Sequence, residues 1–191
     1  MSLLELIARA DERGLAASGL ACLDRCLPPP EAGGDPEPLR PLWASCGSGA
    51  EWADRLDGVH ASLRAAAESD PHAARVRALL GAAPRDFSLV PLRAWAEACS
   101  LLALDVHREF DVPAGGAEVS GGPGAGDGGP LVAGELRRQS HILETLAETG
   151  GTQGGGAGLR RILDLSTEGR RVLRAVMSRH ARGRGRPVGS P

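Results

Sequence analysis

Apolar side chains recur every three or four residues between positions 92 and 110, and this spacing restricts the fold more than any other feature of the chain. The stripe consists of Leu92, Trp95, Cys99, Leu102, Val106 and Phe110. Positions three and four apart share one face of an α-helix, whereas a half-buried strand needs strict alternation. No convincing alternation of that kind occurs in the sequence. The spacing therefore predicts a long helix at the centre of the core and an all-α fold.

The N-terminal segment also has a helical pattern. Ser2 and Glu5 have the spacing of a capping box, which marks a helix start, and apolar residues continue to a stop at Pro28. Gly14 and Gly19 weaken the helical pattern between these points. We predict two short helices in this segment, or one kinked helix.

Two further helices are predicted before the long one. Ser48 and Glu51 repeat the capping-box spacing, and the apolar residues that follow them fall on one helical stripe. These residues are Trp52, Leu56, Val59 and Leu63. Asp70 and Pro71 then offer an N-cap and a first helical residue for a short helix that ends near Gly81.

Two glycine-rich segments divide the C-terminal half of the chain. Residues 111–130 are so rich in Gly and Pro that we predict a flexible loop, and residues 150–158 form a second spacer. Helical spacing resumes over residues 131–148. Ser166 and Thr167 are predicted to cap a final helix.

The predicted organisation is one irregular bundle of about six to eight helices with Gly/Pro-rich loops. Residues 1–110 form an N-terminal helical region, and residues 111–130 form the flexible loop. Residues 131–181 supply helices that complete the same core, and residues 182–191 are a disordered basic tail. A chain of 191 residues fits one such domain.

The composition excludes several classes of enzyme. All 22 basic residues are arginine, and lysine, tyrosine and asparagine are absent, as expected of a GC-rich, bacterial-type coding sequence. Without lysine, the chain has no P-loop lysine, Schiff-base lysine or kinase-type phosphate lysine. Without tyrosine, it has no phenolic acid or nucleophile.

The four cysteines do not form the pattern of a metal site. Cys22 and Cys26 share a helical face, but no second closely spaced pair accompanies them, whereas structural zinc sites usually have paired ligands. We therefore expect no metal and no cofactor. The acidic start of the chain and the absence of an apolar run of about 18 residues predict a cytoplasmic protein with no membrane contact. Its thiols are expected to stay reduced.

The most enzyme-like group of residues is Asp105, His107 and Glu109, near the end of the long helix. Residues two apart on a helix do not face each other, so these residues cannot form a local catalytic dyad. We favour the interpretation that they lie on the solvated surface of the helix. Trp43 follows the linker prolines, and it either covers the core or borders a groove for a ligand.

Positive charge is concentrated at the C-terminus. Residues 160–191 hold nine arginines against Asp164 and Glu168, a net charge of +7, while the whole chain carries −2. Such ends bind polyanions or acidic partners, or the acidic body of their own chain. The residues that would contact nucleic acid are Arg171, Arg174, Arg182, Arg184 and Arg186.

The tail contains Arg184-Gly185-Arg186-Pro187, which resembles the core of an AT-hook. The resemblance covers four residues and implies contact of the two arginines with the narrow minor groove of A·T-rich DNA. The residues from Val188 to Ser190 supply no basic flank. The alternative, which we favour, is a solvated tail that binds nucleic acid or other polyanions weakly.

These observations lead to three functional hypotheses. The leading one is a cytoplasmic, non-catalytic module for protein–protein interaction or regulation, whose partner is another protein or a second copy of the chain in a homodimer. The first alternative is a nucleic-acid-associated regulator that uses the basic C-terminus. The second alternative is a small helical enzyme or ligand-binding protein that uses the residues around His107 and Trp43.

Overall fold

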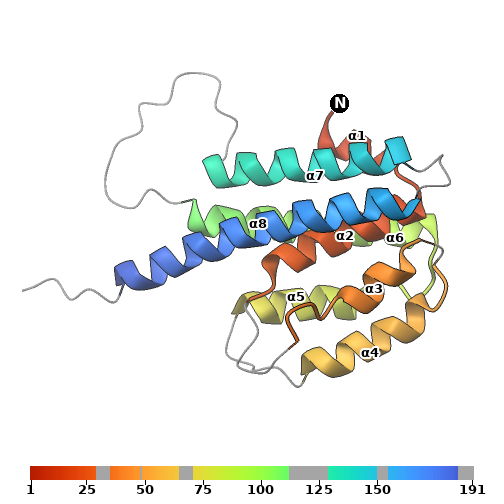
Figure 1. Cartoon of the computed structure of the whole chain (residues 1–191), viewed down its shortest axis with the longest axis horizontal. Helices are drawn as coiled ribbons and strands as arrows, with labels where there is room; N and C mark the ends of the chain where they lie inside the picture. The colour runs from red at the N-terminus through yellow and green to blue at the C-terminus, as the bar shows by residue number, and fades with distance from the viewer. Residues whose placement is uncertain (29–34, 48, 65–70, 112–128, 150–154, 185–191) are drawn as a thin grey trace, which may run out of the picture.

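The described part of the chain is all-α, as predicted. The computed structural model describes residues 1–28, 35–47, 49–64, 71–111, 129–149 and 155–184. Within these residues it contains eight helices and no strand (Figure 1). The helices are α1 (Leu3–Arg9), α2 (Glu12–Cys26), α3 (Arg40–Ser45), α4 (Trp52–Arg64), α5 (Pro71–Gly81), α6 (Leu89–Phe110), α7 (Pro130–Thr149) and α8 (Gly155–Arg184).

Helix α2 occupies the centre of the bundle. Thirteen of its 15 residues are buried, and it contacts α3, α5, α6, α7 and α8. The long helix α6 forms as predicted and packs along α2, but the central position belongs to the shorter helix. Small residues allow this arrangement, because a Cβ atom at Gly19 would lie 2.6 Å from Cζ3 of Trp95. The glycine that weakens the helical pattern in the sequence is therefore a point of close approach between α2 and α6.

The helices lie on two sides of α2. Figure 1 shows α7 and α8 crossing one side of the bundle and α3, α4 and α5 lying on the other. On the second side, the ring of Trp52 meets that of Trp95 edge-on, with centroids 6.0 Å apart. The indole Nε1 of Trp52 donates to the carbonyl oxygen of Pro84 at 2.8 Å, and that of Trp95 donates to the carbonyl oxygen of Leu79 at 2.8 Å. Each buried indole is thus packed and hydrogen-bonded.

Of the helix starts predicted from capping patterns, one is confirmed and another is wrong. The capping box of Ser2 and Glu5 is present, and α1 and α2 are two separate helices. The second capping box is wrong, because Glu51 is not in the first turn of a helix. It precedes α4 in a left-handed conformation, with φ of 60°, and its carboxylate pairs with Arg55. Ser48 and Asp70 lie outside the described residues. The apolar stripe of α4 is buried as predicted.

The predicted helix start at Ser166 is also wrong, because α8 runs without interruption from Gly155 to Arg184. Ser166 lies in the interior of this helix and is buried. Its hydroxyl Oγ lies 3.0 Å from Oδ2 of Asp24 and 3.3 Å from the carbonyl oxygen of Ala21, both on α2. The hydroxyl is thus used for a contact between helices. Most of the predicted loop at 111–130, part of the second spacer and most of the predicted tail lie outside the described residues.

Candidate functional site

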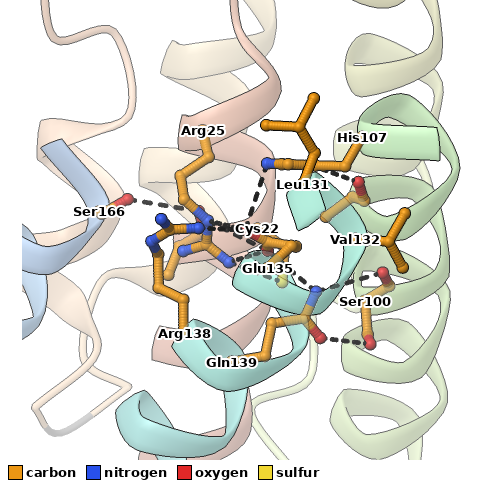
Figure 2. Close-up of polar contacts among 12 residues, drawn as sticks. Cys22, Arg25, Ser100, His107, Leu131, Val132, Glu135, Arg138, Gln139 and Ser166 are labelled. Carbon is orange, nitrogen blue, oxygen red and sulfur yellow. Dashed lines mark hydrogen bonds and ion pairs between the residues drawn. The ribbon is translucent and has the colours of Figure 1, made fainter. Parts of the chain in front are cut away.

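A polar cluster is buried where α2, α6 and α7 meet (Figure 2). Its centre is the ion pair of Arg25 and Glu135, whose side chains are both 0% exposed. Arg25 Nε donates to both carboxylate oxygens of Glu135, at 3.1 and 3.0 Å, and Nη2 also contacts Oε1. Two helices 110 residues apart in the chain are joined here by several charge-assisted hydrogen bonds.

Neighbouring side chains provide further polar contacts to both oxygens of the Glu135 carboxylate. Gln139 Nε2 donates to Glu135 Oε1 at 3.0 Å, and Ser100 Oγ donates to Gln139 Oε1 at 2.6 Å. On the other oxygen, Arg138 Nη1 donates to Oε2 at 3.0 Å, and His107 Nε2 lies 3.4 Å away. The cluster therefore links α7 to α6 as well as to α2.

The charge of Glu135 follows from the groups that surround its carboxylate. Burial raises the pKa of Glu135, but the charge and hydrogen bonds of Arg25 outweigh burial and hold this pKa at about 2. The stabilisation that Glu135 contributes is therefore present above its unfolded pKa of about 4.3, and is lost as the pH falls towards 2. At neutral pH, Arg25 and Glu135 form a fully ionised pair.

The cysteines near this cluster are protonated thiols. Burial raises the pKa of Cys22 to about 12 and also raises the pKa values of Cys26 and Cys99. All four cysteines are free and buried. A nucleophile or metal ligand must be a thiolate, so these groups act as small apolar residues. Among the described residues, no group of three or more Cys, His, Asp and Glu side chains is arranged to hold a metal ion.

A second polar link joins α2 to α8. Asp24 is buried and accepts a hydrogen bond from Arg170 Nη1 at 3.0 Å, beside its contact with Ser166. Arg174 Nη2 donates to the carbonyl oxygens of Pro28 and Leu27, at 3.0 and 3.5 Å. These carbonyls lie at the C-terminal end of α2, where no intrahelical donor remains. Two arginines of the basic C-terminus therefore bind the body of their own chain.

The residues predicted as a possible enzyme site are separated in the structure. Asp105 and Glu109 are exposed and pair with Arg75 of α5. His107 is only 1% exposed and faces Glu135 on the opposite side of the helix. The predicted solvated surface is thus wrong for His107, because its side chain completes the buried cluster. Trp43 is also buried, with 5% of its surface exposed.

The basic residues predicted to contact nucleic acid divide into two groups. Arg174 is used by the fold, as its hydrogen bonds to the end of α2 show. Arg171 and Arg182 are exposed on α8, and Arg171 lies 3.8 Å from Glu168. Arg184 ends α8, but its side chain lies outside the described part of the chain, as does Arg186.

An exposed apolar face on α6 was missed in the sequence. Val90 is 74% exposed and Leu101 is 63% exposed, and Ala94 is exposed between them. Positions 90, 94 and 101 share one side of a helix, because 11 residues make close to three turns. The signal was present as a second apolar stripe of Val90, Ala94 and Leu101, but the sequence does not show whether another element covers this second stripe.

Because comparisons with known proteins gave no match, a functional proposal depends on the structure of this chain alone. No family model, no curated protein and no solved structure matches the chain. Of the helices described, none combines the length and the apolar character needed to cross a membrane.

The buried imidazole of His107 makes stability depend on pH. Burial lowers its pKa, although Glu135 and the carbonyl of Ala103 act in the opposite direction. The unfolded chain then binds a proton where the folded chain does not, so the free energy of unfolding decreases as the pH falls below about 6.5. We expect the urea midpoint to decrease between about pH 7.5 and about pH 5.5, and His107→Gln to lose part of this decrease.

The matched control for this prediction is His141→Gln, because His141 is exposed on α7. This variant should show the same change of midpoint with pH as the wild-type protein. An undiminished change in His107→Gln would show that the buried imidazole is not its source.

Proposed function

We propose that this protein is a non-catalytic module for protein association and that the outer face of α6 is its binding surface. The observation that carries the proposal is the exposure of two large apolar side chains, Val90 and Leu101, on one side of α6, a helix of 22 residues whose other side is buried in the core. Burial of such side chains is favourable by about 25 cal/mol per Å² of apolar area, and exposed apolar patches often mark interaction sites. The buried polar cluster supports the non-catalytic part of the proposal, because the side chains of its Arg25–Glu135 ion pair are closed to solvent.

Photo-crosslinking from this face tests the proposal. A photoreactive amino acid at position 101 should form an adduct of defined mass in a lysate, and added wild-type chain should compete with its formation. Leu101→Glu as the competitor should be at least about tenfold less effective, because it places a charge in the apolar contact. The control position is Val172 on α8, an apolar residue of another helix that is 38% exposed. Equal adducts from both positions, or none from position 101, would contradict the proposal.

A second candidate function is nucleic-acid binding by the C-terminal half of α8. Arg171, Arg179 and Arg182 are exposed there, and residues 171 and 182 are three turns apart on one side of the helix, about 16 Å along its axis. Arginines spaced along one face favour contact with a phosphate backbone. Arg174 is not part of this surface, because it binds the end of α2.

Fluorescence anisotropy with labelled A·T-rich and G·C-rich duplexes at two salt concentrations tests this second candidate. Replacing Arg171 and Arg182 with glutamate should weaken binding roughly tenfold or more at low salt. Replacing Arg160 and Arg161, which are exposed at the other end of α8, makes the same change in net charge and should have a smaller effect. Equal losses in both double variants would show that only net charge matters, and absence of binding would remove the candidate.

A further inference from the structure

We propose that a cleft between α1, α2 and α7 binds a small amphiphile that has an unbranched apolar chain and one carboxylate. The cleft has a volume of about 490 Å³, which lies within the range of about 300–1,000 Å³ found for small-molecule sites. None of the described residues that line it belongs to the outer face of α6. A ligand in this cleft is therefore an addition to the proposed function and does not depend on it.

The cleft forms where the ends of three helices meet. Helix α1 has only seven residues, and Ala10 alone separates its last residue from Asp11, the N-cap of α2. Helix α7 contacts both of these helices, and Figure 1 shows α1 beside its C-terminal end. Because the chain turns between α1 and α2, this end of α7 is not completely covered. Leu143, Leu146 and Ala147 of α7 line the space that remains.

The inner part of the cleft is apolar. Leu6 of α1 lines it together with Leu143 and Leu146, and all three leucines are buried members of the core. Ala147 is exposed, so it lies nearer the mouth of the cleft. An apolar wall of this kind favours a chain of methylene groups, since each buried CH₂ strengthens binding about fourfold.

Arg9 supplies the charge that selects the other end of the ligand. It lines the cleft and is exposed. Among the described residues, its guanidinium makes one hydrogen bond, from Nη1 to the sulfur of Met1 at 3.8 Å, and a thioether is a weak acceptor. A carboxylate accepts two parallel hydrogen bonds from a guanidinium, so it would replace this contact with a stronger one.

Two carboxylates near Arg9 are engaged in helix capping. Glu5 Oε2 accepts a hydrogen bond from the backbone nitrogen of Ser2 at 2.7 Å. Asp11 Oδ1 accepts one from the backbone nitrogen of Gly14 at 2.7 Å, at the positive end of α2. Within the described part of the chain, no acidic side chain forms an ion pair with Arg9. An ammonium group on the ligand would be repelled by this cation, whereas a single carboxylate complements it.

Isothermal titration calorimetry with decanoate tests the ligand class. We expect one site with a dissociation constant on the order of 100 µM. Octanoate should bind roughly 15-fold more weakly, because it lacks two methylene groups. Decylamine has the same chain with the opposite charge, and it should bind at least about tenfold more weakly than decanoate.

A substitution at the mouth of the cleft tests the place of the ligand. Ala147→Phe puts an aromatic ring there and should weaken decanoate binding at least about tenfold. Ala175→Phe on α8 is the matched control, because Ala175 is also exposed and lies outside the cleft. Circular dichroism should show that both variants keep their helical content.

The role of Arg9 is tested by comparing decanoate with decanol, which has the same chain and no charge. Arg9→Gln should weaken decanoate binding about tenfold and leave decanol binding unchanged. Arg137→Gln removes the charge of an exposed arginine of α7 that does not line the cleft. Both ligands should bind this control variant as they bind the wild-type protein.

The outcomes separate the ligand class from the site. Decanoate binding that weakens in Ala147→Phe and in Arg9→Gln, and not in the control variants, supports the proposal. Absence of decanoate binding at about 1 mM would overturn it, as would undiminished binding to Ala147→Phe. Decylamine that binds as tightly as decanoate, or equal losses of decanoate and decanol in Arg9→Gln, would overturn the carboxylate. None of these results changes the crosslinking expected from position 101, so the proposed function is tested separately.

Discussion

Glu135→Ala is expected to lower the free energy of unfolding by about 3–5 kcal/mol, because it leaves the guanidinium of Arg25 buried without its counter-charge. Arg25 has no exposed side-chain surface, so water does not replace the lost carboxylate unless the helices separate. Urea unfolding followed by circular dichroism measures the change. The expected loss is a large fraction of the stability of a domain of this size.

Two controls separate burial of charge from loss of a side chain. Glu51→Ala breaks an ion pair with Arg55 in which the Glu51 side chain is 64% exposed, and it should cost no more than about 1 kcal/mol. The double variant Arg25→Met with Glu135→Leu removes both charges and should recover most of the loss. If Glu135→Ala costs as little as Glu51→Ala, the ion pair does not hold α2 and α7 together.

Gly19→Ala is expected to destabilise the protein by about 2–3 kcal/mol, although alanine is the better helix former. The new methyl group would lie 2.6 Å from one carbon and 2.9 Å from another carbon of the Trp95 ring, so α2 and α6 would have to separate. Trp95 is held in place by its hydrogen bond to Leu79 and by the ring of Trp52. The ring therefore has little freedom to move away.

The matched control is Gly58→Ala in α4. A Cβ atom at Gly58 meets no atom within 4 Å apart from its chain neighbours and the nearby backbone of its own helix, so this substitution should stabilise the protein by about 0.5–1 kcal/mol through helix propensity alone. Opposite signs for the two glycine variants, measured by urea unfolding, would confirm the close approach of α2 and α6. A gain in stability for Gly19→Ala would show that the two helices are not in tight contact there.

The predictions that hold depend on local chemistry. The spacing of Leu92, Trp95 and Cys99 specifies a helix and its apolar side, and the capping box of Ser2 and Glu5 is complete within four residues. Both signals involve neighbours along the chain, so the sequence is sufficient to find them. The same local reasoning fails at Glu51 and Ser166, where other contacts use the side chain that a cap would require.

By itself, the sequence determined the all-α class and the positions of most of the helices, because helix formation depends on residues three and four apart. Only the tertiary structure decided that α2 is central, that His107 is buried and that Arg174 binds the end of another helix. These results depend on pairs such as Arg25 and Glu135, or Arg174 and Pro28, which lie 110 and 146 residues apart. No periodicity encodes such pairs, since they arise only when complete helices pack against one another.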